Sequence, residues 1–268
     1  ADIGIGEGLS VTVRMGELEA IEHQRDKGLG ITVYVDQRKG SATTTDFSAQ
    51  AIKDSVLAAC TIARNASSDK YAGLIAAEYL ATEIPDLDLY HPWKITPDQA
   101  TELAIECETA ARQIDSRITN ADGTLVNSYS GNHVYANSHG FIGGWDWSNH
   151  LIDCTVIADE NGMQRDGWYS KARDAEDLED TQEIARKAAQ RTVARLGARK
   201  LTTRQAPVLF EASVAGSLFS AFIGAISGGA LYRKASFMLD KINQQIFAEH
   251  IHIHEDPFLP KAMGSAAF

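Results

Sequence analysis

The N-terminal part of the chain contains two alternating stretches, Leu9-Ser10-Val11-Thr12-Val13 and Ile31-Thr32-Val33-Tyr34-Val35. In each of them every second residue is apolar, so the apolar side chains of one strand share one face. The residues between them alternate glutamates with apolar positions, which is typical of a further strand with a solvated face, and Gly28 and Gly30 punctuate the pattern. The region from Ile3 to Thr45 therefore predicts strands of an antiparallel sheet.

Helical signals follow this sheet in three places. Apolar residues recur at helical spacing from Ser48 to Asn65, with Asp46 as the expected N-cap. The run Thr96-Pro97-Asp98-Gln99 combines an N-cap, a proline at the first helical position and the glutamine of a capping box. A third helix is expected over residues 176–196, because acidic residues open it and Gly197 follows its end. Strands and helices together predict an α+β fold whose N-terminal part is a two-layer α/β domain with an antiparallel sheet.

Aromatic residues gather in a predicted antiparallel meander, residues 123–157, and just after it. Asparagines and glycines mark the turns of this meander. Its aromatic side chains either line a groove for an extended peptide or pack against the sheet, as most sheet aromatics do. The residues in question are Tyr129, Tyr135, Trp145, Trp147, Trp168 and Tyr169.

Composition and charge restrict the class of protein. With 268 residues and 44% hydrophobic residues, the chain has enough material for a large core and about two domains. Its formal net charge of -11 argues against direct contact with nucleic acid. Cys60, Cys107 and Cys154 are widely spaced, which predicts reduced thiols in a cytoplasmic protein, and no segment is apolar enough to predict a membrane span. Because the chain opens without Met and closes without a natural stop, we expect a fragment at both ends.

A change in composition near residue 200 predicts a domain boundary. Residues 206–268 contain only five acidic and four basic residues. We therefore divide the chain into an N-terminal α/β domain, residues 1–200, and the start of a C-terminal, mainly β domain, residues 201–268, which opens with a strand at 207–210. A segment with so few charged residues needs to be shielded from water by further sequence, by the first domain or by a partner subunit.

One cluster of potential metal ligands stands out, His250-Ile251-His252-Ile253-His254. In a strand the three histidines would share one face about 6.6 Å apart, from which two imidazoles can share a zinc ion. The sequence nominates no third ligand, and the polar outer face of an edge strand explains the pattern equally well. No phosphate-binding loop, nucleophile elbow or HExxH motif occurs. The residues alone therefore predict no catalytic group.

Several short motifs together resemble the PmbA/TldE proteins of the TldD/PmbA family, long labelled modulators of DNA gyrase. The resemblance covers essentially the whole chain. Each motif is weak alone, but their combination is specific. The matching stretches are residues 11–17, 21–23, 26–34, Lys39-Gly40-Ser41-Ala42-Thr43, Asp86 to Trp93, Asn137-Ser138-His139-Gly140, Ala206-Pro207-Val208 and Gly216-Ser217-Leu218.

This resemblance implies a non-catalytic role. In the family, a TldD-like subunit carries an HExxxH motif on a helix, binds zinc and acts as a metallopeptidase, and a TldE-like subunit pairs with it. Aligned on that motif, this sequence has Ser220 and Ala225 in place of the two histidines and Ala221 in place of the glutamate. None of these can bind zinc or act as the base. The resemblance therefore implies no catalytic residue and no metal in this chain, and zinc in the partner.

By the same resemblance, the chain is expected to form a heteromeric zinc metallopeptidase with a TldD-like subunit, or else a homodimer. The complex would degrade or process unfolded peptides, including precursors of gyrase-targeting toxins. An extended peptide would bind as an added strand, in a cavity made by the α/β domain and a barrel-like C-terminal domain. Two alternatives stay open. One is an independent metal-dependent hydrolase that uses His250, His252 and His254, and the other is a scaffold without a proteolytic role.

Overall fold

The computed structural model describes residues 1–268, which form two compact units. The first consists of Ala1–Ala198 together with Asp256–Phe268, and the second of Arg199–Glu255. No helix of either is both long and apolar enough to cross a membrane.

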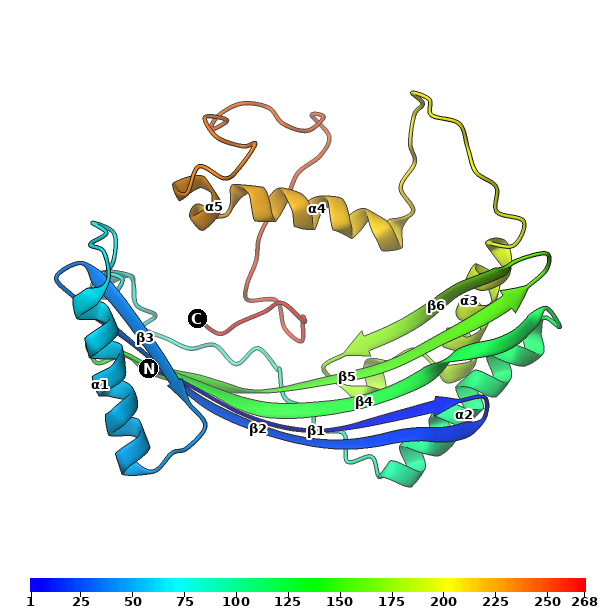
Figure 1. The fold of residues 1–268 in the computed structure, drawn as a ribbon, viewed down its shortest axis with the longest axis horizontal. Coiled ribbons are helices and arrows are strands. Elements are labelled where there is room, and N and C mark those ends of the chain that lie inside the picture. The colour runs from blue at the N-terminus through cyan, green and yellow to red at the C-terminus, as the bar shows by residue number, and fades with distance from the viewer. The chain divides into compact units, whose positions relative to one another are not determined.

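The first unit is built on a six-stranded antiparallel sheet with the strand order β3-β2-β1-β4-β5-β6. Figure 1 shows that its long strands curl, so the sheet has a concave and a convex face. The α+β class and the antiparallel sheet predicted from the sequence are confirmed. The strands are β1 Asp2–Arg14, β2 Glu17–Val35, β3 Arg38–Thr44, β4 Ile118–Ala136, β5 Ile142–Asp159 and β6 Met163–Ala172.

The hairpin of β1 and β2 follows the predicted alternation. Leu9, Val11 and Val13 are buried on one face, as their spacing predicts. The turn lies at Met15 and Gly16, whose φ angles are both positive, as a tight two-residue hairpin requires. Gly28 and Gly30 do not end a strand, contrary to the prediction. They lie inside β2 and pair with Gly4 and Asp2 of β1, so the neighbouring strand supplies the hydrogen bonds that keep β2 continuous.

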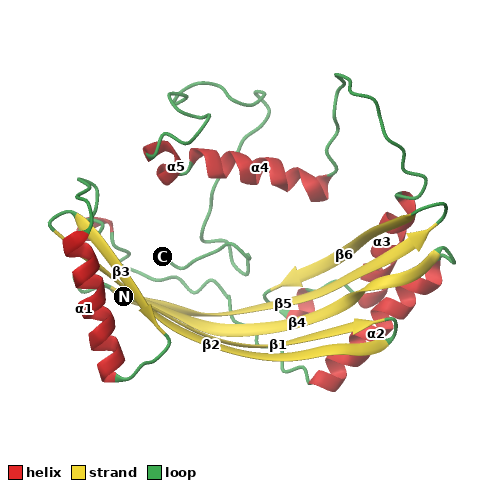
Figure 2. Cartoon of the chain, in the orientation of Figure 1, coloured by secondary structure: helices red, strands yellow, loops and turns green.

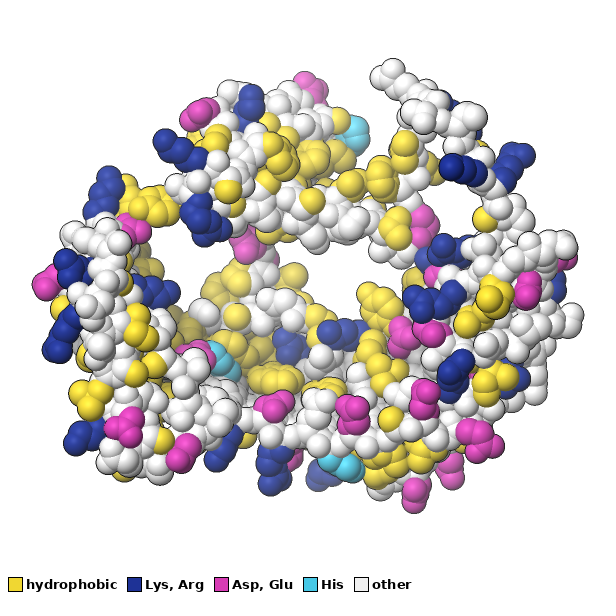
Figure 3. Space-filling view, in the orientation of Figure 1, with side chains coloured by type: hydrophobic (Ala, Val, Ile, Leu, Met, Phe, Trp, Pro, Cys, Tyr) yellow, Lys and Arg dark blue, Asp and Glu magenta, His cyan; other side chains and the backbone are white.

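Three helices cover the convex face of this sheet, as Figure 2 shows. They are α1 Ala49–Asn65, α2 Pro97–Ile114 and α3 Thr181–Ala194. Helices α2 and α3 pack over one end of the sheet, where Val11, Val126 and Ile152 from adjacent strands form a core with Ile184 of α3. Helix α1 packs over the other end, against Leu29 and Ile31 of β2, and its outer surface carries charged side chains of both signs (Figure 3). The middle of the long strands is therefore left without a helical cover.

The helix ends agree in part with the sequence signals. The capping box of Thr96 and Gln99 is formed, and Pro97 stands at the start of α2 as predicted. The N-cap of α1 is Ser48 rather than Asp46, because the Asp46 carboxylate instead accepts hydrogen bonds from the backbone and the hydroxyl of Ser48. Helix α3 begins at Thr181, later than predicted. Residues 175–177 form a separate 3-10 turn.

Buried polar groups hold the two layers together. Glu108 of α2 is fully buried, and its carboxylate accepts hydrogen bonds from the backbone N–H groups of Met15 and Gly16, at 3.1 and 2.9 Å. It therefore ties α2 to the turn of the first hairpin. Cys107 and Cys154 are buried in the same core, where a hydrogen bond between the two thiols and burial raise the pKa of Cys107. The same hydrogen bond lowers the pKa of Cys154, and both thiols are shielded from solvent by their complete burial.

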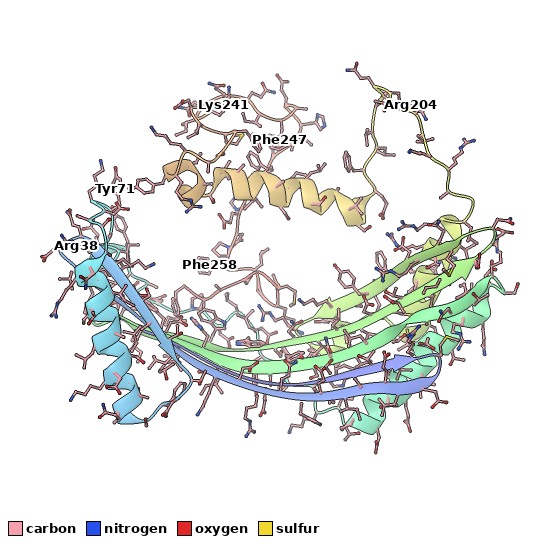
Figure 4. The ribbon with its side chains drawn as sticks, viewed as in Figure 1. Arg38, Tyr71, Arg204, Lys241, Phe247 and Phe258 are labelled. Carbon is pink, nitrogen blue, oxygen red and sulfur yellow. The ribbon has the colours of Figure 1, made fainter.

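The C-terminal end of α1 is tied to the β2–β3 turn. Arg38 donates from Nη1 to the carbonyl oxygen of Arg64 at 2.9 Å, and the backbone N–H of Asp69 donates to the carbonyl of Gln37 at 2.8 Å. Figure 4 shows Arg38 and Tyr71 at this end of the sheet. The position of α1 is therefore determined by the sheet edge as well as by its apolar face.

The second unit contains helices α4 Ala212–Ile226 and α5 Gly228–Tyr232 and no strand. The rings of Phe222 and Phe247 meet edge to face at 4.9 Å, and Figure 4 shows Phe247 beside α4. The predictions of a strand at 207–210 and of a histidine-bearing strand at 250–254 are wrong for this structure, in which residues 201–268 contain no strand. An alternating pattern specifies a strand only where a neighbouring strand accepts its hydrogen bonds, and no strand pairs with these residues. A mainly β C-terminal domain that starts at residue 201 stays a prediction.

Candidate functional site

Across the concave face of the sheet, glycines stand on β1 and β2 and aromatic residues on β4 and β5. Residues directly opposite each other in antiparallel strands share a face, so the register defines rows of side chains across the sheet. Three successive rows run from β2 to β5. They are Gly28, Gly4, His133, Trp145; Asp26, Gly6, Gly131, Trp147; and Gln24, Gly8, Tyr129, Asn149.

The glycines let aromatic rings lie flat on the neighbouring strand. A Cβ added at Gly8 would overlap the ring of Tyr129, and one added at Gly131 would lie 2.8 Å from Cζ2 of Trp147. The Trp147 ring continues toward Gly6, where an added Cβ would lie 3.7 Å from Cζ2. In contrast, a Cβ added at Gly4 or Gly28 would meet nothing within 4 Å. No side chain therefore lies over the backbone at Gly4 and Gly28, and we call this area the glycine patch.

Two adjoining hollows follow this glycine patch, and we call them together the glycine groove. One has a volume of about 470 Å³ and reaches the aromatic rings, and the other has about 680 Å³ and reaches the end of β3. The hollows share Gly4 and Gly28. Such volumes are in the range of ligand pockets. The remaining residues that line the groove on the concave face include Gly6, Gln24, Asp26, Gly30, Thr43, Tyr129, His133 and Trp147.

The groove carries two acidic residues on the concave face, Asp26 in the first hollow and Asp2 in the second. The Asp26 carboxylate makes no hydrogen bond or ion pair, whereas Asp2 contacts Nε2 of His133 at 3.2 Å. Lys27, the next residue, extends to the convex face, where its ammonium lies 5.1 Å from the centre of the Phe47 ring. Burial raises the pKa of Tyr129, and the negative charges of Glu22 and Asp26 add to this effect. Asp26 is thus a carboxylate without a counterion beside aromatic side chains.

The C-terminal segment of the same unit, residues 256–268, packs against Trp145 of β5. Trp145 meets the Phe268 ring edge to face at 5.1 Å and lies 4.5 Å from the ring of His133. Leu87, Leu89 and Ala267 complete this cluster. Trp145 is therefore a packing residue, whereas Trp147 makes no ring contact with another aromatic side chain.

Of the six aromatic residues selected from the sequence, five lie on the concave face and one does not. Trp168 points to the convex face, where its Nε1 donates to Glu179 at 3.1 Å and Lys187 lies over its ring. Sequence reasoning missed Asp26, His133 and the glycines. The signal that could have found them is the repeat Gly4, Gly6, Gly8 at every second residue of a strand, which removes side chains from one face.

A cluster of charged groups ties the C-terminal segment to the sheet. His91 contacts Asp174 through Nδ1 at 3.1 Å, and Lys261 contacts the same carboxylate at 3.1 Å. Lys261 lowers the pKa of Asp174, after the backbone hydrogen bond from Glu176, which is the larger cause. His150, fully buried nearby, donates from Nε2 to the carbonyl of His91 at 2.8 Å, and burial lowers its pKa. These groups position the loop and the segment, and none of them faces the glycine groove.

The three histidines considered as alternative metal ligands are not placed around a common metal site. His250, His252 and His254 lie in an exposed stretch without regular structure, and no group of three or more His, Cys, Asp or Glu side chains is placed to hold a metal ion. Ser220, Ala221 and Ala225 lie on α4, and the Ser220 hydroxyl donates to the Gly216 carbonyl at 3.0 Å. Two alanines and a serine whose hydroxyl is engaged with its own helix do not fit a zinc site, which needs imidazole, thiolate or carboxylate ligands.

Three domain models of one protein family match the chain. They are described as PmbA/TldA metallopeptidase domain 1, matching residues 3–63, the central domain, matching residues 90–196, and the C-terminal domain, matching residues 203–268. Together they account for most of the sequence.

Among curated proteins, the chain is 47% identical to the metalloprotease PmbA of Escherichia coli O157:H7 and 42% identical to a PmbA homologue of Haemophilus influenzae. Each match covers 97% of this chain and 58% of the relative, so the chain spans a little over half the length of these relatives.

Among solved structures, a protein described as a modulator of DNA gyrase from Bacteroides thetaiotaomicron has a TM-score of 0.90 at 24% identity, over 100% of this chain and 61% of its own. TldE from Thermococcus kodakarensis has a TM-score of 0.64 at 17% identity, over 90% of this chain and 54% of its own. At these identities, the likeness shows a common fold.

Proposed function

The chain belongs to the PmbA/TldD metallopeptidase family, and we propose that it acts as a TldE-like, non-catalytic subunit of a zinc metallopeptidase whose metal is bound by a TldD-type partner. The proposed substrates are unfolded peptides, including peptide toxin precursors. The proposed location is the cytoplasm, in keeping with three free cysteines.

One observation carries the non-catalytic role. The positions that correspond to the family's HExxxH motif are Ser220, Ala221 and Ala225, all on α4. A zinc peptidase needs ligands that bind the metal and a base that takes a proton from its water. Alanine has no such group, and the Ser220 hydroxyl is used within its helix. A partner with an intact motif would supply what this chain lacks.

The concave face supports the proposed peptide substrate. An extended peptide needs an open, elongated surface, and the glycine groove offers exposed backbone between the end of β3 and the aromatic rings of β4 and β5. The proposed division into domains at residue 200 would place this groove in the N-terminal α/β domain. The low charge of residues 206–268 supports a subunit interface in the C-terminal part.

Peptide hydrolysis by purified proteins tests this proposal. An unfolded, fluorescence-quenched peptide is incubated with this protein alone, with a TldD-type partner alone and with both, each with and without a zinc chelator. We expect hydrolysis that requires the partner, increases when this protein is added and disappears with the chelator.

Two outcomes would contradict the proposal. Chelator-sensitive hydrolysis by this protein alone, lost in a His252→Ala variant, would identify it as an independent metalloenzyme. A partner whose hydrolysis rate, products and assembly state are unchanged by this protein would identify a scaffold outside proteolysis.

A further inference from the structure

We propose that the glycine groove binds the side chain of an arginine in an extended peptide, with Asp26 as the counterion and Trp147 as the aromatic surface on which the guanidinium stacks. This inference rests on the proposed function for the peptide nature of the ligand. The chemistry of the site itself follows from the residues of the concave face.

The floor of the groove gives the ligand access to the backbone. Gly4 and Gly28 stand opposite each other in β1 and β2, and an added Cβ at either position would meet no atom within 4 Å. A side chain of an incoming peptide can therefore lie directly on the sheet at this point. No side chain of the same unit has to move first.

The two groups that recognise the cation lie in one row of the sheet. Asp26, Gly6, Gly131 and Trp147 are successive cross-strand neighbours. The Trp147 ring lies across Gly131 and reaches Gly6, so only the Gly6 position separates it from Asp26. Adjacent strands are about 4.8 Å apart. A cation placed over Gly6 is therefore within about one strand spacing of both the carboxylate and the indole ring.

The charge of the site selects a cation, because no basic side chain of the same unit forms an ion pair with Asp26, although Lys27 also lines the hollow. Lys27 is directed to Phe47 on the other face, and Arg25 pairs there with Glu7 at 3.1 Å. His133 is the basic group on the concave face nearest to the floor, and it is engaged with Asp2 and with the ring of Trp145. Arginine is favoured over lysine because its planar guanidinium stacks on aromatic rings and is more weakly hydrated.

Binding of three matched peptides to this chain tests the inference without the partner subunit. The probes are acetyl-Gly-Ser-Gly-Xaa-Gly-Ser-Gly-amide with arginine, lysine or citrulline at Xaa. Citrulline keeps the shape of arginine and removes its charge. Binding is followed by NMR through the indole N–H signal of Trp147, which is assigned with a Trp147→Phe variant.

We expect the arginine peptide to shift the Trp147 signal and to bind about five-fold more tightly than the citrulline peptide, with lysine between them. Asp26→Asn should remove this preference, whereas Glu102→Gln, the same loss of charge on the exposed face of α2, should leave it unchanged. Gly4→Leu should abolish binding by filling the floor, where the new Cβ meets no atom within 4 Å. Raising the salt concentration from 50 to 500 mM should reduce the preference, since exposed charges are screened.

Equal affinity of the arginine and citrulline peptides, or binding that survives both Asp26→Asn and Gly4→Leu, would overturn the inference. Its failure is distinguishable from failure of the proposed function. If hydrolysis by the mixed subunits persists while the arginine preference is missing, only the groove assignment is wrong. If the preference is present but the partner's hydrolysis is unaffected by this protein, the groove is a binding site and the proposed role in proteolysis is wrong.

Discussion

Replacing Gly40 with alanine tests how closely α1 is packed on the edge of the sheet. Gly40 is a buried residue of β3, opposite Val33 of β2. A Cβ at this position would overlap the carbonyl oxygen of Ala59 and the backbone nitrogen of Ala63, and would lie 3.0 Å from Cα of Ala63. All three are backbone atoms of α1, so no change of side-chain rotamer can relieve the overlap. The helix itself has to withdraw.

The size of the effect follows from this withdrawal. Non-bonded carbon atoms are in contact at about 3.5–4.0 Å, so α1 has to move by at least about 0.5 Å from Gly40, and the overlap with the other two atoms requires more. A gap of about 0.5–1 Å forfeits about a quarter to a half of the dispersion energy of each contact it opens. The contacts at risk are those that α1 makes with Leu29 and Ile31. We expect Gly40→Ala to lower the free energy of unfolding by about 2–3 kcal/mol, as overpacked cores do.

Gly28→Ala is the matched control, since it makes the same substitution in the same sheet at a position where the new Cβ meets nothing within 4 Å. Alanine there should raise the free energy of unfolding by about 0.4–1 kcal/mol, because it restricts the unfolded chain. Urea unfolding followed by circular dichroism measures both values, and hydrogen exchange of the α1 amides shows whether the loss is local. Equal stability of the two variants would refute the close packing of α1 on β3.

Three further predictions concern the buried polar groups. Glu108→Ala should lower the free energy of unfolding, measured in urea, by about 2–4 kcal/mol, because the backbone N–H groups of Met15 and Gly16 lose their carboxylate acceptor. Glu102→Ala on the same helix is the control and should change this free energy by less than about 0.5 kcal/mol. Burial lowers the pKa of His150, so the unfolded state binds the extra proton first as the pH falls. The free energy of unfolding should therefore decrease below about pH 6.5, by at most about 1.4 kcal/mol per pH unit. In a pH series of unfolding curves this decrease should be smaller for His150→Gln, and equal slopes for the two proteins would contradict the assignment. A thiol reagent should modify Cys60 in the native protein and the two buried thiols only after unfolding, as mass spectrometry of labelled peptides can show.

Local patterns predicted the elements of the first unit well. The alternation around Val11 and Val13, the capping box at Thr96 and the apolar stripe of α1 each depend on neighbours within a few residues, so the sequence contains all the information they need. The predicted strands of the C-terminal part failed for the complementary reason. Their alternating residues have no paired strand in this structure, and a strand without a partner leaves its backbone groups unsatisfied.

The antiparallel hairpins and the three helices of the first unit follow from local patterns of the sequence alone. Which residues meet across strands depends on the fold as a whole. Asp26 and Trp147 are far apart in the chain, and they share one row because the register places Gly6 and Gly131 between them. Register depends on hydrogen bonds between distant segments, and a shift by one residue would turn every one of these side chains to the opposite face.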